Sequence, residues 1–150
     1  MPEEDGVVFN ADGLILGRMA SAVAQRLLRG ERVYIVNAEK TVVSGERSSL
    51  VRAWKDFLKV KSMANPRYGP FHSRRPDRII RDAVRGMLPP EKEKGKAGLR
   101  RLRVYIGVPD SMRESQLKTI PEAAPKKLRR RYVLLGDLSK EIGWKRRGSG

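Results

Sequence analysis

Apolar residues recur along the chain with two different spacings, and the change between them predicts the order of strands and helices. Short apolar runs at residues 7–9 and 32–37 are typical of buried strands. Between them, residues 16–29 carry pairs of apolar side chains every four positions, which is the pattern of one helix face. A strand, a helix and a strand with short joints predict a β–α–β unit with parallel strands and a right-handed crossover.

The remaining elements follow from the same apolar patterns and from turn residues between them. Helices are predicted at residues 48–61, 77–87 and, as a final turn with Ser139 as its cap, 138–144. Strands are predicted at residues 40–43 and 102–107, and the apolar run 132–135 is expected to form an edge strand or a docked segment. Residues 91–98 (EKEKGKAG) and 109–125 are expected to be loops. We find no internal repeat and no long linker, so we expect one domain over residues 1–150, of which about 126–150 form a basic C-terminal extension.

Charge divides this pattern into two halves. The chain has 33 basic and 17 acidic residues, a formal net charge of +16. Residues 1–60 carry 9 basic and 8 acidic side chains, whereas residues 61–150 carry 24 and 9. A nearly neutral half followed by a cationic half indicates a folded scaffold with a binding surface for a polyanion. Nucleic acid is the first choice of partner and an anionic membrane the second.

The candidate binding surface centres on residues 65–90, a proline-broken loop followed by the helix predicted at 77–87. In the loop, aromatic rings alternate with arginines, a combination that suits RNA because bases stack on rings while phosphates attract guanidinium groups. In the helix, we expect Ile79, Ile80, Ala83, Val84 and Met87 to face inward. The opposite side, which we call the arginine face, consists of Arg78, Arg81 and Arg85. A solvated surface is the alternative reading of this face.

Two further basic clusters lie in the C-terminal extension, and they are either nucleic-acid arms or solubility tails. We expect arms because of the large overall charge. The complete set of predicted RNA-binding residues is Arg67, Tyr68, His72, Arg74, Arg75, Arg78, Arg81, Arg85, Lys126, Lys127, Arg129, Arg130, Arg131, Lys145, Arg146 and Arg147.

The residues for catalysis or cofactor binding are missing from the sequence. There is no cysteine, and His72 is the single histidine, with no carboxylate partner nearby in sequence. We expect His72 to contact RNA or to hold its loop. Gly13 and Gly17 flank the start of the first predicted helix, but they form no phosphate-binding glycine motif, so we expect turn residues there. We predict no enzymatic activity, no metal, no cofactor and no small-molecule substrate.

Several motifs together resemble one known family. They are DGLILGRMAS (12–21), VNAEK (36–40), SG (44–45), NPRYGPFHSRRPDRIIRDAVRGMLP (65–89), LRVYIGVP (102–109) and EIGWK (141–145). The chain is similar to the large-subunit ribosomal protein thirteen family, in its archaeal and eukaryotic branch. The resemblance implies a three-layer α/β/α fold with a small, mainly parallel four-stranded sheet.

The same resemblance implies a structural constituent of the large ribosomal subunit. Its partners would be large-subunit rRNA and neighbouring large-subunit proteins, and it would support subunit assembly. No signal segment or membrane-spanning run is found, and we expect a soluble, cytoplasmic protein without membrane contact. The alternatives are a non-ribosomal nucleic-acid-binding protein, such as one that binds duplex DNA, and an RNA-modifying enzyme.

Overall fold

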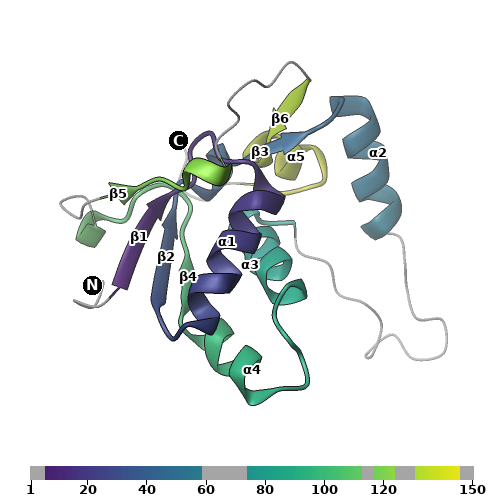
Figure 1. The fold of residues 1–150 in the computed structure, drawn as a ribbon. Helices are drawn as coiled ribbons and strands as arrows, with labels where there is room; N and C mark the ends of the chain where they lie inside the picture. The colour runs from purple at the N-terminus through teal and green to yellow at the C-terminus, as the bar shows by residue number, and fades with distance from the viewer. Residues whose placement is uncertain (1–5, 59–73, 113–116, 124–130, 146–150) are drawn as a thin grey trace.

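A parallel four-stranded sheet forms the centre of the protein (Figure 1). The computed structural model describes residues 6–58, 74–112, 117–123 and 131–145. Within these, the strand order is β4-β2-β1-β5, with β1 at Gly6–Asn10, β2 at Arg32–Val36, β4 at Leu102–Val104 and β5 at Leu117–Lys118. All three neighbouring pairs run parallel. The predicted α/β class with a small parallel sheet is therefore confirmed.

The predicted β–α–β unit is present as β1, α1 (Leu16–Leu28) and β2. The apolar stripe of α1 is buried, and its side chains form much of the main core. The helix ends where expected, because Gly30 adopts a positive φ of 94°. There the N–H of Gly30 donates to Leu27 O at 3.1 Å and that of Glu31 to Arg26 O at 3.2 Å, which is the usual pattern of a glycine-terminated helix.

The sheet separates two apolar clusters. On one face, Phe9 and Ile35 pack with α1, α3 (Pro76–Gly86) and α4 (Glu93–Arg100). On the other face, Val8 and Tyr34 pack against Met112 of the 3-10 helix η3 (Asp110–Met112). Alternate side chains of β1 and β2 thus serve opposite layers, as a sheet buried on both faces requires.

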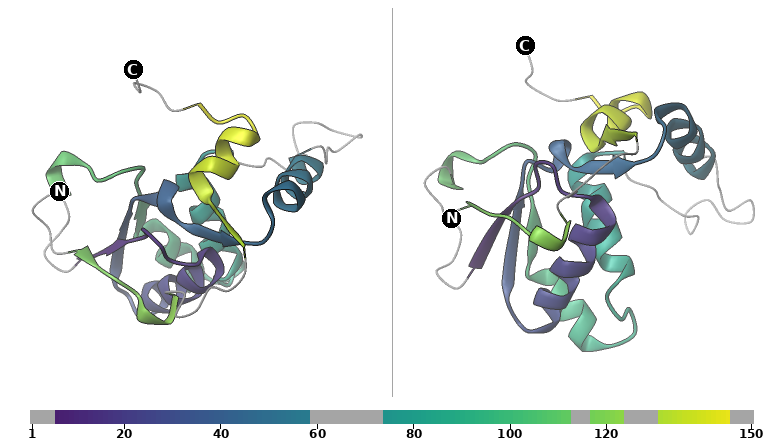
Figure 2. Two further views of the ribbon diagram at one scale, coloured as in Figure 1. Left: turned by 90° about the horizontal axis from the view of Figure 1, so that it is seen from above. Right: turned by 45° about the horizontal axis from the view of Figure 1, so that its top comes forward.

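A second, two-stranded sheet joins the C-terminal part of the chain to the middle. Strand β3 (Val42–Ser44) pairs antiparallel with β6 (Tyr132–Leu134). Helix α5 (Leu135–Glu141) follows β6 directly and packs on the 3-10 helix η1 (Ala38–Lys40). Helix α2 (Arg47–Leu58) contacts α5 on the side away from the main sheet (Figure 2). The predictions of strands near residues 40–43 and 132–135 are confirmed.

One expected loop is a helix. Residues 91–98 were expected to be irregular, but α4 spans Glu93–Arg100. Its two glycines are buried, and a Cβ on Gly98 would lie 3.4 Å from Leu27 Cβ. The helix is held by this close approach to α1, because its own sequence has no broad apolar stripe.

Two other details also differ from the sequence predictions. Met87 was expected to face inward, yet it is 46% exposed, because α3 ends at Gly86 and the chain turns to bury Leu88 instead. Ser139 was expected to cap the last helix, but α5 already begins at Leu135 and Ser139 lies buried inside it.

Two strands of the main sheet are shorter or less obvious than the sequence suggests. Strand β4 covers three residues of the predicted run 102–107. Strand β5 has two residues and lies in a segment that was expected to be irregular, which also contains the 3-10 helix η4 (Pro121–Ala123). None of the helices in the described ranges is long and apolar enough to cross a membrane.

Candidate nucleic-acid interface

Helix α3 presents the arginine face because its other side is fixed in the core. Its start is favoured by Pro76 at the first helical position and by Asp77 in the first turn, although no side chain caps the helix by a hydrogen bond. Ile79, Ile80 and Val84 are buried against the sheet and α1. The remaining side of the helix therefore points away from the core.

The three members of the arginine face are not equivalent. Arg78 and Arg85 are exposed, as predicted. Arg81 is half-buried, and its Nη1 donates a hydrogen bond to the carbonyl oxygen of Leu102 in β4 at 3.2 Å. The structure thus leaves Arg78 and Arg85 accessible to a partner and holds Arg81 against the edge of the sheet.

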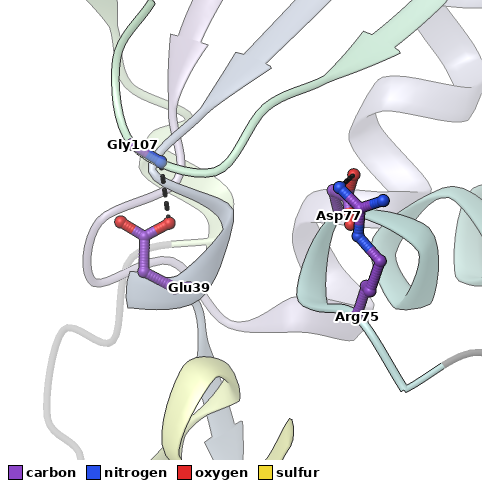
Figure 3. A network of polar contacts seen from close by, with 4 residues as sticks. All are labelled: Glu39, Arg75, Asp77 and Gly107. Carbon is purple, nitrogen blue, oxygen red and sulfur yellow. Dashed lines mark hydrogen bonds and ion pairs between the residues drawn. The ribbon is translucent and has the colours of Figure 1, made fainter. Parts of the chain in front are cut away.

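Two aspartates of α3 pair with arginines at the surface. Arg75 Nη2 lies 3.3 Å from Asp77 Oδ2, as Figure 3 shows, and Arg85 Nη2 lies 3.5 Å from Asp82 Oδ1. The arginine side chains remain 52% and 63% exposed. The aspartates differ, because Asp77 is 17% exposed and Asp82 39%. An exposed pair such as Arg85–Asp82 contributes at most about 1 kcal/mol. A phosphate can therefore compete for the Arg85 guanidinium group without breaking a strong internal interaction.

Polar contacts also tie together the carboxyl ends of β1, β2 and β4, and Figure 3 shows the one between Glu39 and Gly107. Asn37 adopts a left-handed conformation with φ 59°, and its Nδ2 donates to Asn10 Oδ1 at 2.9 Å. The N–H of Gly107 donates to Glu39 Oε2 at 2.9 Å, and its carbonyl accepts from the Asn37 N–H. These contacts explain the VNAEK segment as a structural junction of the scaffold.

The first strand-to-helix turn, which the sequence raised as a possible phosphate site, contacts another segment of the chain. Gly13 lies in a turn with φ 79°, and Gly17 lies in the first turn of α1. The N–H of Ile15, at the N-terminus of α1, donates to Ala123 O of η4 at 2.9 Å. A segment of the same chain therefore accepts one N–H at this end of the helix, while Gly17 remains exposed.

Three other predicted contacts fall within the described residues. Arg74 is exposed, and its side chain lies beside Gly143, two residues before the exposed Lys145. The side chain of Arg131 is 83% exposed, and its Nη1 lies 3.8 Å from Glu46 Oε1. Arg74 thus lies beside the segment that follows α5, although the two are far apart in sequence.

Nine predicted RNA-binding residues lie outside the described residues and stay predictions. They are Arg67, Tyr68, His72, Lys126, Lys127, Arg129, Arg130, Arg146 and Arg147.

Sequence reasoning missed one arginine at this surface. Arg103 is exposed on β4 and lines a cleft of about 420 Å³. We call it the arginine cleft, and its lining residues are Asp77, Arg78, Arg81, Asp82, Arg103 and Val104. The alternation of the strand LRV predicts that Arg103 points outward, but only the packing of β4 beside α3 shows which helix it faces.

The carboxylates of the described residues are dispersed. Within residues 6–58, 74–112, 117–123 and 131–145, histidine, aspartate and glutamate form no group of three placed to hold a metal ion.

Taken together, the fold and surface define a small basic α/β domain with an arginine-rich face on one helix. Comparison with known proteins is more specific. Residues 4–111 match the family model of Ribosomal protein L13. The chain is 43% identical to large ribosomal subunit protein uL13 of Aeropyrum pernix, over 93% of this chain and 90% of that protein.

Two further archaeal relatives carry the same name. The protein of Methanosarcina barkeri is 41% identical over 92% of this chain and 98% of its own length. That of Saccharolobus solfataricus is 41% identical over 95% of each. The chain therefore belongs to the ribosomal protein L13 family, and the resemblance seen in the sequence motifs is confirmed.

Proposed function

We propose that this protein is a structural constituent of the large ribosomal subunit that binds and bridges segments of large-subunit rRNA. Membership of the ribosomal protein L13 family supports the assignment to the subunit. The observation that carries rRNA binding is the arginine face of α3, where Arg78 and Arg85 are exposed on a helix whose other side is buried. In this proposal the protein is not an enzyme. It lies in the cytoplasmic ribosome, next to other large-subunit proteins.

The physical role of the surface is to reduce phosphate repulsion between RNA segments. Guanidinium groups bind phosphate through charge-assisted hydrogen bonds, and each neutralised phosphate releases counterions. Binding should therefore weaken steeply with salt, and recognition should follow RNA shape more than base sequence. The buried scaffold beneath α3 keeps the arginines in fixed positions, which lets one rigid protein hold two RNA segments and support assembly.

The central test replaces Arg78 and Arg85 with glutamine in one variant. We expect rRNA binding to weaken by about tenfold or more, since each lost charge-assisted hydrogen bond is worth about 1.5–3 kcal/mol, and the logarithmic salt slope to fall by about 0.7–0.9 per lost phosphate contact. The measurement is a filter-binding titration of large-subunit rRNA over a salt series. The matched control is Arg29→Gln with Arg52→Gln, which removes the same charge from exposed positions at the C-cap of α1 and on α2.

Equal affinity and equal slope in the variant and the wild type would contradict the assignment of the arginine face. Competition by duplex DNA as strong as that by rRNA would favour a general DNA-binding protein. Cleavage or modification of the RNA by the purified protein would favour an enzyme. Urea unfolding of each variant checks that the fold is kept.

A further inference from the structure

Two arginines from different elements converge on one carbonyl oxygen. Arg81 of α3 donates from Nη1 to Leu102 O at 3.2 Å, and Arg103 of β4 donates from Nη1 to the same oxygen at 3.0 Å. Arg103 Nη1 also lies 3.1 Å from Arg100 O. One neutral carbonyl thus holds two cationic groups as near neighbours, although like charges repel each other.

The surroundings leave this pair with an excess of positive charge. Both side chains line the arginine cleft together with Arg78, which forms no ion pair with a carboxylate in the part of the chain that the structure describes. Asp77 and Asp82 also line the cleft, but each pairs with an arginine outside it, namely Arg75 or Arg85. The two carboxylates of the cleft are therefore shared with Arg75 and Arg85, so they do not fully balance the charge of the three arginines in the cleft.

The unused N–H donors of Arg81 and Arg103 are suited to binding an anion. Each guanidinium group has five N–H donors, and the carbonyl contacts of Arg81 and Arg103 engage Nη1 alone. Anchoring to backbone carbonyls restricts both side chains before any ligand arrives, which lowers the entropy cost of binding. An anion with two equivalent oxygens can accept from both groups at once and relieve their repulsion.

We propose that the arginine cleft seats one phosphodiester group of the rRNA backbone, with Arg81 and Arg103 as its shared ligands and Arg78 at its rim. The inference rests on the proposed rRNA-binding function and adds to it a defined seat between α3 and β4. It also assigns a binding role to Arg103. The seat differs from the outer part of the arginine face because its cations are pre-positioned by the sheet edge.

A double-mutant cycle with Arg81→Gln and Arg103→Gln tests the shared seat. Each single variant should bind rRNA about tenfold more weakly, because it loses a charge-assisted contact. The fold-loss of rRNA affinity in the double variant should be clearly smaller than the product of the two single fold-losses, because both residues bind the same phosphate. The salt slope should fall by about 0.7–0.9 in the double variant, the value for one phosphate. The Arg29→Gln and Arg52→Gln control should show neither coupling nor a comparable loss.

Wild-type affinity in Arg103→Gln, or single effects that multiply fully in the double variant, would overturn the proposal. Arg103 is exposed, so its variant decides the question even where Arg81→Gln lowers stability. A failure of the proposed function is distinguishable, because the wild-type protein itself would then show no salt-dependent rRNA binding. If Arg78→Gln with Arg85→Gln weakens binding while Arg103→Gln does not, only the cleft proposal fails.

NMR spectroscopy distinguishes binding of free inorganic phosphate from binding of an RNA phosphate. We expect the side-chain Nε–H signals of Arg81 and Arg103 to shift with a short RNA oligonucleotide at concentrations far below those needed for inorganic phosphate. Equal responses to both probes would indicate a general anion site and would overturn the assignment to the RNA backbone.

Discussion

Gly95 shows how a single residue can hold a helix in a place where the sequence predicts a loop. A Cβ at this position would clash with the carbonyl oxygen of Pro89, so the backbone would have to move. Gly17 in α1 offers the opposite situation, because a Cβ there meets no atom within 4 Å. The two glycines are therefore a matched pair for testing the packing of α4.

We predict that Gly95→Ala destabilises the protein by about 1–3 kcal/mol, because overpacking outweighs the gain in helix propensity. Gly17→Ala should be neutral or stabilising by up to about 1 kcal/mol, since alanine favours the helix. Urea unfolding followed by circular dichroism measures both free energies of unfolding. A neutral Gly95→Ala variant would show that α4 does not approach residue 89 as closely as described.

The arginines illustrate what residue spacing reveals and what it leaves hidden. The spacing of residues 78, 81 and 85 correctly predicts that Arg78 and Arg85 are exposed. It cannot predict the anchoring of Arg81, because the acceptor is a carbonyl 21 residues further along the chain. For the same reason, the position of Arg103 beside the arginine face follows from tertiary packing and not from its local sequence.

At the scale of elements, the periodicity of apolar residues is sufficient to predict a helix or strand where the segment is long. Helices α1 and α3 and the paired strands β1 and β2 were all predictable, because each buries a complete apolar face or run. Helix α4 was not, since its stability depends on glycines that fit against Leu27 and Pro89. Strand β5 has two residues and depends on pairing with β1.

The end of α3 provides a test of where the helix stops. Leu88, which follows the helix, is 4% exposed, whereas Met87 is 46% exposed. We predict that Leu88→Ala costs about 2–5 kcal/mol of unfolding free energy and Met87→Ala less than about 1 kcal/mol. Chemical denaturation of the two variants checks this. A larger loss for Met87→Ala would restore the longer helix that the sequence suggested.

On the scale of the whole molecule, the division of charge along the chain does not correspond to a division of the fold. The nearly neutral N-terminal residues supply β1, α1 and β2, but the cationic part contributes β4, β5 and α3 to the same sheet and core. Strand β6 pairs with β3, so the C-terminal part is also joined to the middle of the chain. Scaffold and binding surface therefore share one apolar core, and the net charge of +16 acts on both.

This charge gives salt two opposite effects. In the free protein, salt should raise the thermal midpoint by a few degrees between about 0.1 M and 1 M NaCl, because the Debye length falls from about 10 Å to about 3 Å and self-repulsion is screened. Over the same interval, rRNA affinity should fall by orders of magnitude, because counterion release is lost. Differential scanning calorimetry and filter binding measure the two quantities. A thermal midpoint that falls with salt would show that internal ion pairs, such as those of Arg75 and Arg85, outweigh the repulsion that an RNA partner is proposed to relieve.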